Sequence, residues 1–348
     1  MHPQIGREFK YKTSEMYNEI QNLVLNLNIE IIHKEIIKIK QKNPSTFIGK
    51  GNLLRLKDKI TKYKINLLII NNNLSPSQQR NLEKFLNIKV TDRSGIIIEI
   101  FSKRASTKES KLQVELAELI YRKSRLVRAW THLERQRGGT TFIGGPGELQ
   151  IELDKRLIQT KIIKIKKRLV KVKARRQIQR KSRLNSNFKT FALVGYTNAG
   201  KTKLFNKLTK KKQSSQNKLF ETLDTKISKF YLNDHQVGII DTVGFINNIP
   251  TQLIESFHAT LEEITSANFI INVVDVNDIN AKDKILTTKR ILKETGVCEE
   301  KISKMINVYN KIDLSNSNYT QNENRIFISA LTGEGIENLR DSIERKLI

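Results

Sequence analysis

The segment 195–202 reads GYTNAGKT, which fits the phosphate-binding pattern G-x-x-x-x-G-K-[ST]. An apolar run over 190–194 precedes it and a helical pattern over 203–208 follows it. In this strand–loop–helix order, backbone N–H groups close on phosphate oxygens beside the positive end of a helix dipole. A chance glycine-rich turn is the alternative, and the flanking pattern weighs against it. The residues expected to line a nucleotide site are Gly195, Tyr196, Thr197, Asn198, Ala199, Gly200, Lys201 and Thr202.

Two residues of this loop have distinct expected roles, and a later carboxylate joins them. Lys201 is expected to bridge the β- and γ-phosphates, and the Thr202 hydroxyl is expected to bind Mg²⁺. An apolar run over 236–240 ends at Asp241, and an aspartate at a strand tip can hold Mg²⁺ through water. The amide of Gly244 is expected to meet the γ-phosphate. This D-x-x-G turn consists of Asp241, Thr242, Val243 and Gly244.

A third motif indicates which base is bound. The run 304–309 predicts a strand, and the N-K-x-D residues Asn310, Lys311, Ile312 and Asp313 follow at its end. The Asp313 carboxylate can accept hydrogen bonds from guanine N1–H and N2–H₂, whereas adenine has no such pair of donors. A buried carboxylate left unpaired is costly, so this motif favours GTP over ATP. A polar turn after a strand is the alternative reading.

Two further segments are expected to complete the site. The last predicted strand, 325–330, leads into Ser329, Ala330 and Leu331, and the Ser329 and Ala330 amides can reach guanine O6. Switch I is expected between the phosphate loop and Asp241, where Thr222 would bond the γ-phosphate and Mg²⁺ only in the triphosphate state, with Thr225 as a competitor. Its expected nucleotide contacts are Phe220, Glu221, Thr222, Leu223 and Asp224.

The position after D-x-x-G, where Ras-type GTPases carry a water-orienting glutamine, is Phe245. A phenylalanine has no donor or acceptor, so we expect slow hydrolysis of GTP to GDP and phosphate, stimulated by a partner. The expected catalytic residues are Lys201, Thr222 and Gly244, and the expected Mg²⁺ ligands are Thr202, Thr222 and Asp241.

From about residue 15 onward the chain resembles the HflX family of GTPases. The resemblance includes the phosphate loop, the run DTVGFI at 241–246, and unusual runs outside the nucleotide motifs: DRSG at 92–95, WTHLERQ at 130–136 and GPGE at 145–148. It implies binding to the large ribosomal subunit and its rRNA, with a glycine-rich tip and a role in ribosome splitting, rescue or stress response. The tip departs from the family pattern, because Gly144 replaces an arginine and Leu149 a threonine.

The charge is distributed unevenly. The formal net charge of the chain is +28, and residues 1–187 carry 41 Lys and Arg against 16 Asp and Glu, whereas the rest is nearly neutral. Between Asp154 and Arg183 there are 14 Lys and Arg. A basic region placed this way predicts a polyanionic partner. The alternative is a solvated surface enriched in lysine by coding bias.

Hydrophobic periodicity predicts an α/β fold in three parts. We expect a small α/β domain over 1–105, a basic antiparallel helical hairpin over 106–187, and a Ras-like GTPase domain with a mainly parallel sheet over 188–348. In the first part, 66–70 and 95–101 are predicted strands and 76–85 a helix with Ser75 as N-cap.

Other features of the sequence exclude several classes of protein. A single cysteine, Cys298, rules out a disulfide framework, and no apolar run approaches the length of a membrane span. We therefore expect a cytoplasmic monomer without a membrane anchor. Two rivals stay open: an rRNA-binding assembly or remodelling factor whose nucleotide site is structural, and a signalling GTPase acting at a membrane surface.

Overall fold

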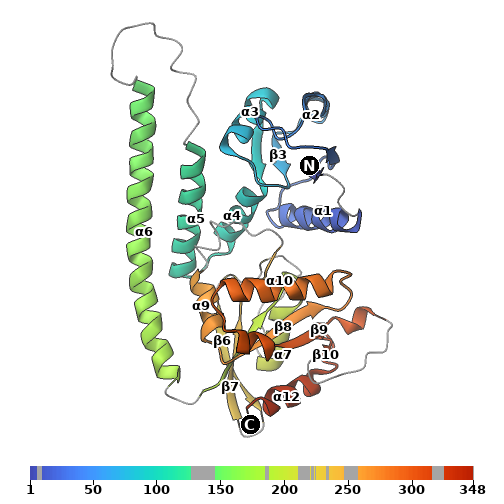
Figure 1. Cartoon of the computed structure of the whole chain (residues 1–348), viewed down its shortest axis with the longest axis vertical. Coiled ribbons are helices and arrows are strands. Elements are labelled where there is room, and N and C mark those ends of the chain that lie inside the picture. The colour runs from blue at the N-terminus through green and yellow to red at the C-terminus, as the bar shows by residue number, and fades with distance from the viewer. Residues whose placement is uncertain are drawn as a thin grey trace. The chain divides into compact units, whose positions relative to one another are not determined.

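The computed structural model describes residues 1–5, 10–126, 146–184, 188–210, 220, 223, 225–232, 235–246, 258–315 and 325–347 (Figure 1). The chain divides into two compact units. Unit 1 comprises Met1–Lys103 and Leu112–Leu169, and unit 2 comprises Arg104–Lys111 and Val170–Ile348. No helix within the described ranges has the length and apolar character needed to cross a membrane.

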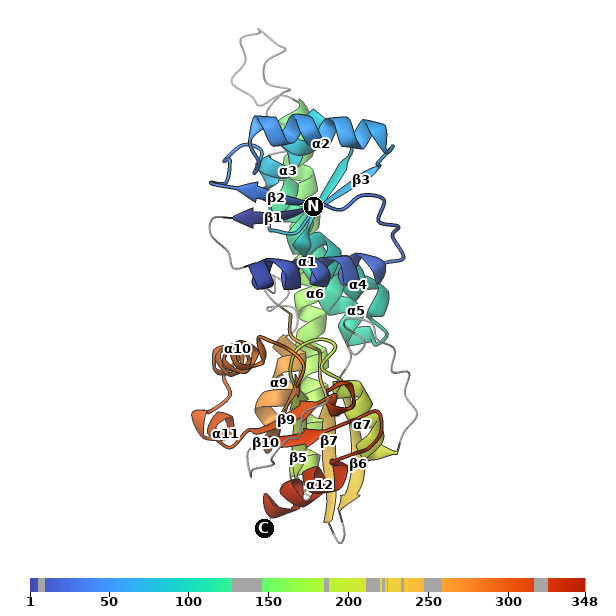
Figure 2. The same ribbon diagram turned by 90° about the vertical axis from the view of Figure 1, so that its right-hand side faces the viewer.

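Unit 1 contains two small parallel sheets of two strands each, with helices around them. Strand β1 pairs with β2 and strand β3 with β4, both in parallel. Met1 connects the two pairs, because its amine donates to the Ile69 carbonyl (2.9 Å) and its carbonyl accepts from the Asn71 amide (3.0 Å). Figure 2 shows β1 and β2 between helices α2 and α1. The elements are β1 (His2–Ile5), α1 (Lys10–Leu25), β2 (Ile36–Ile39), α2 (Lys50–Lys62), β3 (Leu67–Ile70), α3 (Pro76–Leu86), β4 (Lys89–Asp92) and α4 (Arg93–Arg104).

One predicted element is confirmed here and one is wrong. Helix α3 starts at Pro76 with the full capping box, in which Ser75 and Gln78 cap each other's backbone. The predicted strand over 95–101 is instead part of helix α4. Asp92 caps this helix, since its Oδ1 accepts a hydrogen bond from the Gly95 amide (2.9 Å). All four isoleucines of this run are buried in the helix, so tertiary packing overrides their β propensity.

The helical hairpin consists of α5 (Lys108–Leu126) and α6 (Pro146–Leu184), which lie side by side (Figure 1). Lys123, in the last turn of α5, donates to Gln159 in the first half of α6 (2.6 Å), which fits antiparallel helices. Their apolar seam is small; it contains Leu112, Leu116, Ile162 and Ile165, with Leu119, Ile120, Ile158 and Leu169 packed against it. Leu157, which helical spacing of the apolar residues in α6 would also place in this seam, is 61% exposed. The predicted tip lies outside the described residues except for Pro146 and Gly147, which begin α6.

Unit 2 is built on a six-stranded sheet with the strand order β10-β9-β8-β5-β7-β6. All pairings are parallel except that of β6 with β7. The mainly parallel sheet that we predicted is therefore confirmed. The elements are β5 (Thr190–Val194), α7 (Lys201–Thr209), β6 (Lys226–Leu232), β7 (His235–Asp241), α9 (His258–Ser266), β8 (Phe269–Asp275), α10 (Ala281–Glu294), α11 (Glu299–Ser303), β9 (Ile306–Asn310), the 3₁₀ helix η2 (Ile312–Leu314), β10 (Arg325–Ile328) and α12 (Ile336–Arg345).

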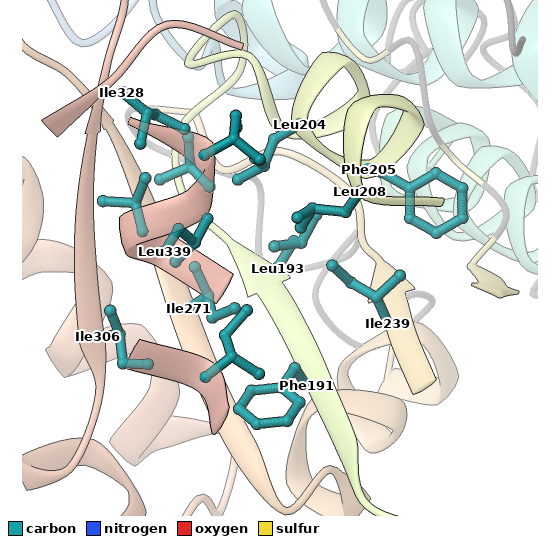
Figure 3. Packing of buried hydrophobic residues seen from close by; sticks show 14 of the residues in the cluster. Phe191, Leu193, Leu204, Phe205, Leu208, Ile239, Ile271, Ile306, Ile328 and Leu339 are labelled. Atoms are coloured by element: carbon teal, nitrogen blue, oxygen red, sulfur yellow. The ribbon is translucent and has the colours of Figure 1, made fainter. Parts of the chain in front are cut away.

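Apolar side chains cover both faces of this sheet. On one face, residues of the strands meet those of α7 and α12, and Figure 3 shows Phe191, Leu193, Leu204 and Leu339 pointing into this cluster. On the other face, a second cluster includes Ile264 of α9 and other side chains from α10 and β5. Because both faces are covered, the strands are rigid, and the loops at their carboxyl ends form the natural place for a ligand.

A buried carboxylate joins α5 to strand β4 of unit 1. Asp92 is completely buried and accepts hydrogen bonds from the Tyr121 hydroxyl (2.9 Å), the Arg125 guanidinium (2.6 Å) and the Leu74 amide (3.1 Å). Arg125 also donates to the Leu74 carbonyl and lies over the Tyr121 ring. Burial raises the pKa of Tyr121, and the nearby Asp92 charge raises it further. This network fixes the C-terminal end of α5.

The Asp92 network gives a prediction about stability. Replacing Asp92 with alanine leaves the Arg125 charge and the Tyr121 hydroxyl without their buried acceptor, which costs about 3–5 kcal/mol. Hydrogen exchange of the intact chain, read by mass spectrometry, should show this loss in the opening free energy of α4 and α5. The matched control, Asp58→Ala on the exposed side of α2, should change it by less than about 0.5 kcal/mol. Unchanged exchange in Asp92→Ala would contradict the assignment.

Candidate nucleotide-binding site

Two glycines give the phosphate loop its shape. Gly195 has φ 135° and Gly200 has φ 96°, both in the region that L side chains avoid. A Cβ atom at Gly195 would lie 2.2 Å from the Val273 carbonyl oxygen, and one at Gly200 would lie 2.1 Å from Asn310 Nδ2. The loop therefore packs directly against the neighbouring strand β8 and against the Asn310 side chain at the end of β9, and no other residue fits at either position.

Lys201 is buried at the centre of this loop. Its side chain is 6% exposed, and its Nζ donates to the carbonyls of Gly195 (3.0 Å) and Tyr196 (2.8 Å). Burial lowers its pKa to about 8, against the opposing effect of the Asp241 charge. A buried ammonium at a helix N-terminus is a site for an anion, because an incoming phosphate would supply the charge that the site lacks.

Two oxygen donors meet beside the lysine. The Thr202 hydroxyl donates to Asp241 Oδ2 (3.0 Å), and both side chains are buried. The neighbouring Thr242 hydroxyl donates to the Leu193 carbonyl (2.6 Å) and ties the end of β7 to β5. One carboxylate and one hydroxyl are a fitting donor set for Mg²⁺, which prefers oxygen ligands and takes the rest from phosphates and water. Elsewhere, the described residues contain no group of three or more His, Cys, Asp or Glu that could hold a metal.

The turn after β7 lies against the phosphate loop. A Cβ atom at Gly244 would lie 2.9 Å from Lys201 Nζ and 2.8 Å from Thr197 Cγ2. Phe245 bridges to the loop through its backbone, donating to the Gly195 carbonyl (3.0 Å) and accepting from the Thr197 amide (2.7 Å). Its side chain is 1% exposed and packs in the apolar cluster with Tyr196 and Ile264. The residue following D-x-x-G thus anchors the turn. Val243 is buried as well.

Three loops meet at the side chain of Asn310. Its Nδ2 donates to the Ala199 carbonyl (2.8 Å), and its Oδ1 accepts from the Ala330 amide (2.9 Å). Asp313 lies in the short helix η2 and accepts a hydrogen bond from the Ser329 hydroxyl (2.5 Å). The structure therefore brings the phosphate loop, the N-K-x-D motif and the loop after β10 together, as their order in the sequence suggested.

Sequence reasoning missed part of this arrangement. The Ser329 and Ala330 amides, which we expected at guanine O6, donate to the Glu334 carbonyl and to Asn310. The contact of the Ser329 hydroxyl with Asp313 was not predicted, and no local pattern marks it. Lys207 of α7 also donates to the Thr332 carbonyl (3.2 Å) and supports the same loop.

The remaining predicted site residues differ in placement. Glu221, Thr222 and Asp224 lie outside the described residues, so the expected switch I contact stays a prediction. Phe220 and Leu223 are buried, and Phe220 has a positive φ of 56°. Four other predicted site residues lie in the loops around the site. Asn198 and Lys311 have positive φ angles of 63° and 71°. Ile312 begins η2, and Leu331 is exposed.

Comparison with known proteins agrees with this geometry. Residues 14–102 match the family described as GTP-binding GTPase N-terminal, 104–183 the GTP-binding GTPase Middle Region, and 190–311 the 50S ribosome-binding GTPase. The fold is similar to that of a GTP-binding protein from the archaeon Sulfolobus solfataricus in complex with GDP, with 26% identity, a TM-score of 0.50, and coverage of 99% of this chain and 98% of that chain.

Curated relatives cover almost the whole chain. GTPase HflX of Magnetococcus marinus is 42% identical over 99% of this chain and 80% of its own length. GTPase HflX of Escherichia coli is 36% identical over 97% of this chain and 80% of its own length. This similarity extends through both units, well beyond the nucleotide motifs that many proteins share. The chain therefore belongs to the HflX family of GTPases.

Proposed function

We propose that GTP binds with its guanine at Asp313 and its phosphates around Lys201, and is hydrolysed to GDP and phosphate. The observation that carries this proposal is the double hydrogen bond of Asn310, which links the phosphate loop to the loop beside Asp313. A carboxylate beside a phosphate cradle suits guanine N1–H and N2–H₂ at one end and phosphates at the other. The side-chain oxygens of Asp241 and Thr202 would hold Mg²⁺, which would neutralise part of the phosphate charge.

The residues around the γ-phosphate have different proposed roles. Lys201 would leave the Gly195 and Tyr196 carbonyls to bind phosphate oxygens, and the Gly244 amide would meet the γ-phosphate. Thr222 would close over it in the triphosphate state. Because Phe245 is buried and apolar, a partner must help to orient the attacking water, and hydrolysis by the isolated protein should be slow.

The partner proposed for this chain is the large ribosomal subunit and its rRNA. Helix α6 is strongly basic, with 14 Lys and Arg against three Asp and Glu, and described side chains such as Lys161, Lys164, Lys167 and Arg168 are exposed on it. The sequence of α6 has no carboxylate between Lys155 and Leu184, and such a solvent-facing row of cations suits a phosphate backbone. The family matched by residues 190–311 is described as a ribosome-binding GTPase, which supports the same partner.

In this proposal the three parts, 1–105, 106–187 and 188–348, act as a monomer in the cytoplasm. Binding of GTP would favour association with the ribosome, and hydrolysis would release the protein. The process served would be ribosome splitting, rescue or the stress response.

The burial of Phe245 favours one alternative. Since no polar side chain follows D-x-x-G, the nucleotide site of an rRNA-binding assembly or remodelling factor could serve structure alone. The two proposals differ in whether the function of the protein requires GTP hydrolysis.

Lys201→Ala tests whether the site is catalytic. It should abolish measurable GTP hydrolysis in the presence of large subunits and weaken GDP binding at least about tenfold, because the phosphates lose their charged partner. The control is Lys203→Ala, the next lysine of α7, which is only half-buried. Ribosome-linked activity that survives in Lys201→Ala would support the structural alternative instead.

Asp313→Asn tests the choice of base. An amide cannot accept from both guanine donors, but its N–H₂ can donate to the 2-oxo group of xanthine. GDP affinity should therefore fall by about two orders of magnitude and XDP affinity should rise. Isothermal titration calorimetry with both nucleotides measures this, with the exposed Asp341→Asn as control. Equal affinity of the unaltered protein for GDP and ADP would contradict the proposal itself.

A charge variant tests the partner. Lys164→Glu with Arg168→Glu on α6 should lower binding to large subunits and reduce the slope of log affinity against log salt by roughly two, one for each lost phosphate contact. Sedimentation with purified subunits between low and high salt gives the slope. The matched control, Lys282→Glu with Arg290→Glu on α10, changes the net charge equally. If the two pairs act alike, net charge and not α6 governs binding.

A further inference from the structure

The turn that follows β8 contacts two consecutive residues of the N-K-x-D motif. Asp275 Oδ2 pairs with Lys311 Nζ at 2.7 Å, and Asn277 Nδ2 donates to the Lys311 carbonyl at 3.1 Å. The backbone of the same turn contributes as well, since the Val276 amide donates to the Asn310 carbonyl (3.0 Å). Lys311 is thus held at its side chain and at its backbone by one short segment.

Lys311 needs such support because of its backbone conformation. Its φ is 71°, in the left-handed region where a residue with a Cβ atom is strained. A residue in a strained backbone conformation keeps that conformation only where several contacts with its surroundings stabilise it. Here those contacts come from Asp275 and Asn277, and Asp275 Oδ1 in turn fixes the turn by accepting from the Asn277 amide (3.0 Å).

The conformation of Lys311 decides where Asp313 lies. The chain turns at Lys311 into η2, and the Leu314 amide donates to the Lys311 carbonyl (3.1 Å) across this turn. Asp313 is the second residue of η2, and its carboxylate is held from the opposite side by the Ser329 hydroxyl. If Lys311 relaxed to a negative φ, the short helix would shift and the carboxylate with it.

We propose that Asp275 and Asn277 are positioning residues for base recognition, which hold Lys311 in its left-handed conformation and thereby orient Asp313 toward guanine. This rests on the proposed function, in which Asp313 accepts from the guanine base. The two residues do not touch the nucleotide. They determine how well the site discriminates guanine from a base that lacks its 2-amino group.

The test uses the full chain with Asp275→Asn, Asn277→Ala and Asp275→Glu. Calorimetry with GDP and IDP in the presence of magnesium gives the ratio of the two affinities, because hypoxanthine lacks the 2-amino group that Asp313 would accept from. We expect Asp275→Asn and Asn277→Ala to weaken GDP binding about tenfold and IDP binding much less, so that the ratio falls. The KM for GTP should rise in parallel, while kcat at saturating GTP stays within about twofold. Asp275→Glu, which keeps the charge, should recover part of the ratio.

The control variant is Asp283→Asn, which changes the same residue type at an exposed position in the first turn of α10. It should leave both affinities unchanged. The inference is overturned if the Asp275 and Asn277 variants weaken the binding of GDP and IDP equally. It is also overturned if they keep the full preference for GDP. In either case the turn contributes to the stability of the protein and not to base recognition. If the unaltered protein shows no preference for guanine nucleotides, the proposed function fails first, and this result is distinct from the other two.

Discussion

The buried side chain of Asn310 is the interaction on which the nucleotide site depends. In the sheet order, β8 lies between β9 and β5, so the phosphate loop and the N-K-x-D motif come from strands that are not neighbours. Asn310, only 2% exposed, spans this gap by donating to Ala199 and accepting from Ala330. Only an amide of this length offers a donor and an acceptor at once, whereas an aspartate would accept at both positions. The absence of a side chain at Gly200 allows the close approach.

The sheet makes this cross-link possible because it places rigid strand ends at one edge. Apolar clusters cover both of its faces, and each loop of the site starts from a strand end that is anchored by them. Phe245 shows how closely the packing and the chemistry are connected. Its ring belongs to the apolar cluster, while its backbone pairs with Gly195 and Thr197. The turn that would sense the γ-phosphate is therefore fastened to the loop that would bind the other phosphates.

Local patterns were enough to predict the strands that precede the phosphate loop, the D-x-x-G turn and the N-K-x-D motif, because each motif follows a short apolar run. They failed for the segment 95–101, where a run of isoleucines reads as a strand. The signal for a helix was the carboxylate of Asp92 three residues before Gly95, which caps α4. Leu157 is exposed although the spacing of apolar residues along α6 includes it in the apolar stripe, because the seam follows Ile158, Ile162 and Ile165.

Contacts between distant segments could not be predicted, since no local pattern encodes them. Asp275 pairs with Lys311, and Ser329 donates to Asp313. These contacts form only because β8, β9 and β10 are adjacent in the sheet, and this adjacency is a property of the fold. Both contacts lie around the segment that carries the Asp313 carboxylate. A short polar side chain at the end of a neighbouring parallel strand is thus a candidate for such a role, even when it belongs to no motif.

The hairpin shows a different balance between packing and charge. Its apolar seam is narrow, and like charges three or four residues apart on α6 weaken the helix. Two features offset this: the ion-paired network at Asp92 fixes the C-terminal end of α5, and Lys123 ties that end to α6. Exposed basic side chains on α6, such as Lys161, Lys164 and Arg168, add a repulsion that this packing must offset. In the proposed function, the phosphates of a bound polyanion would relieve that repulsion.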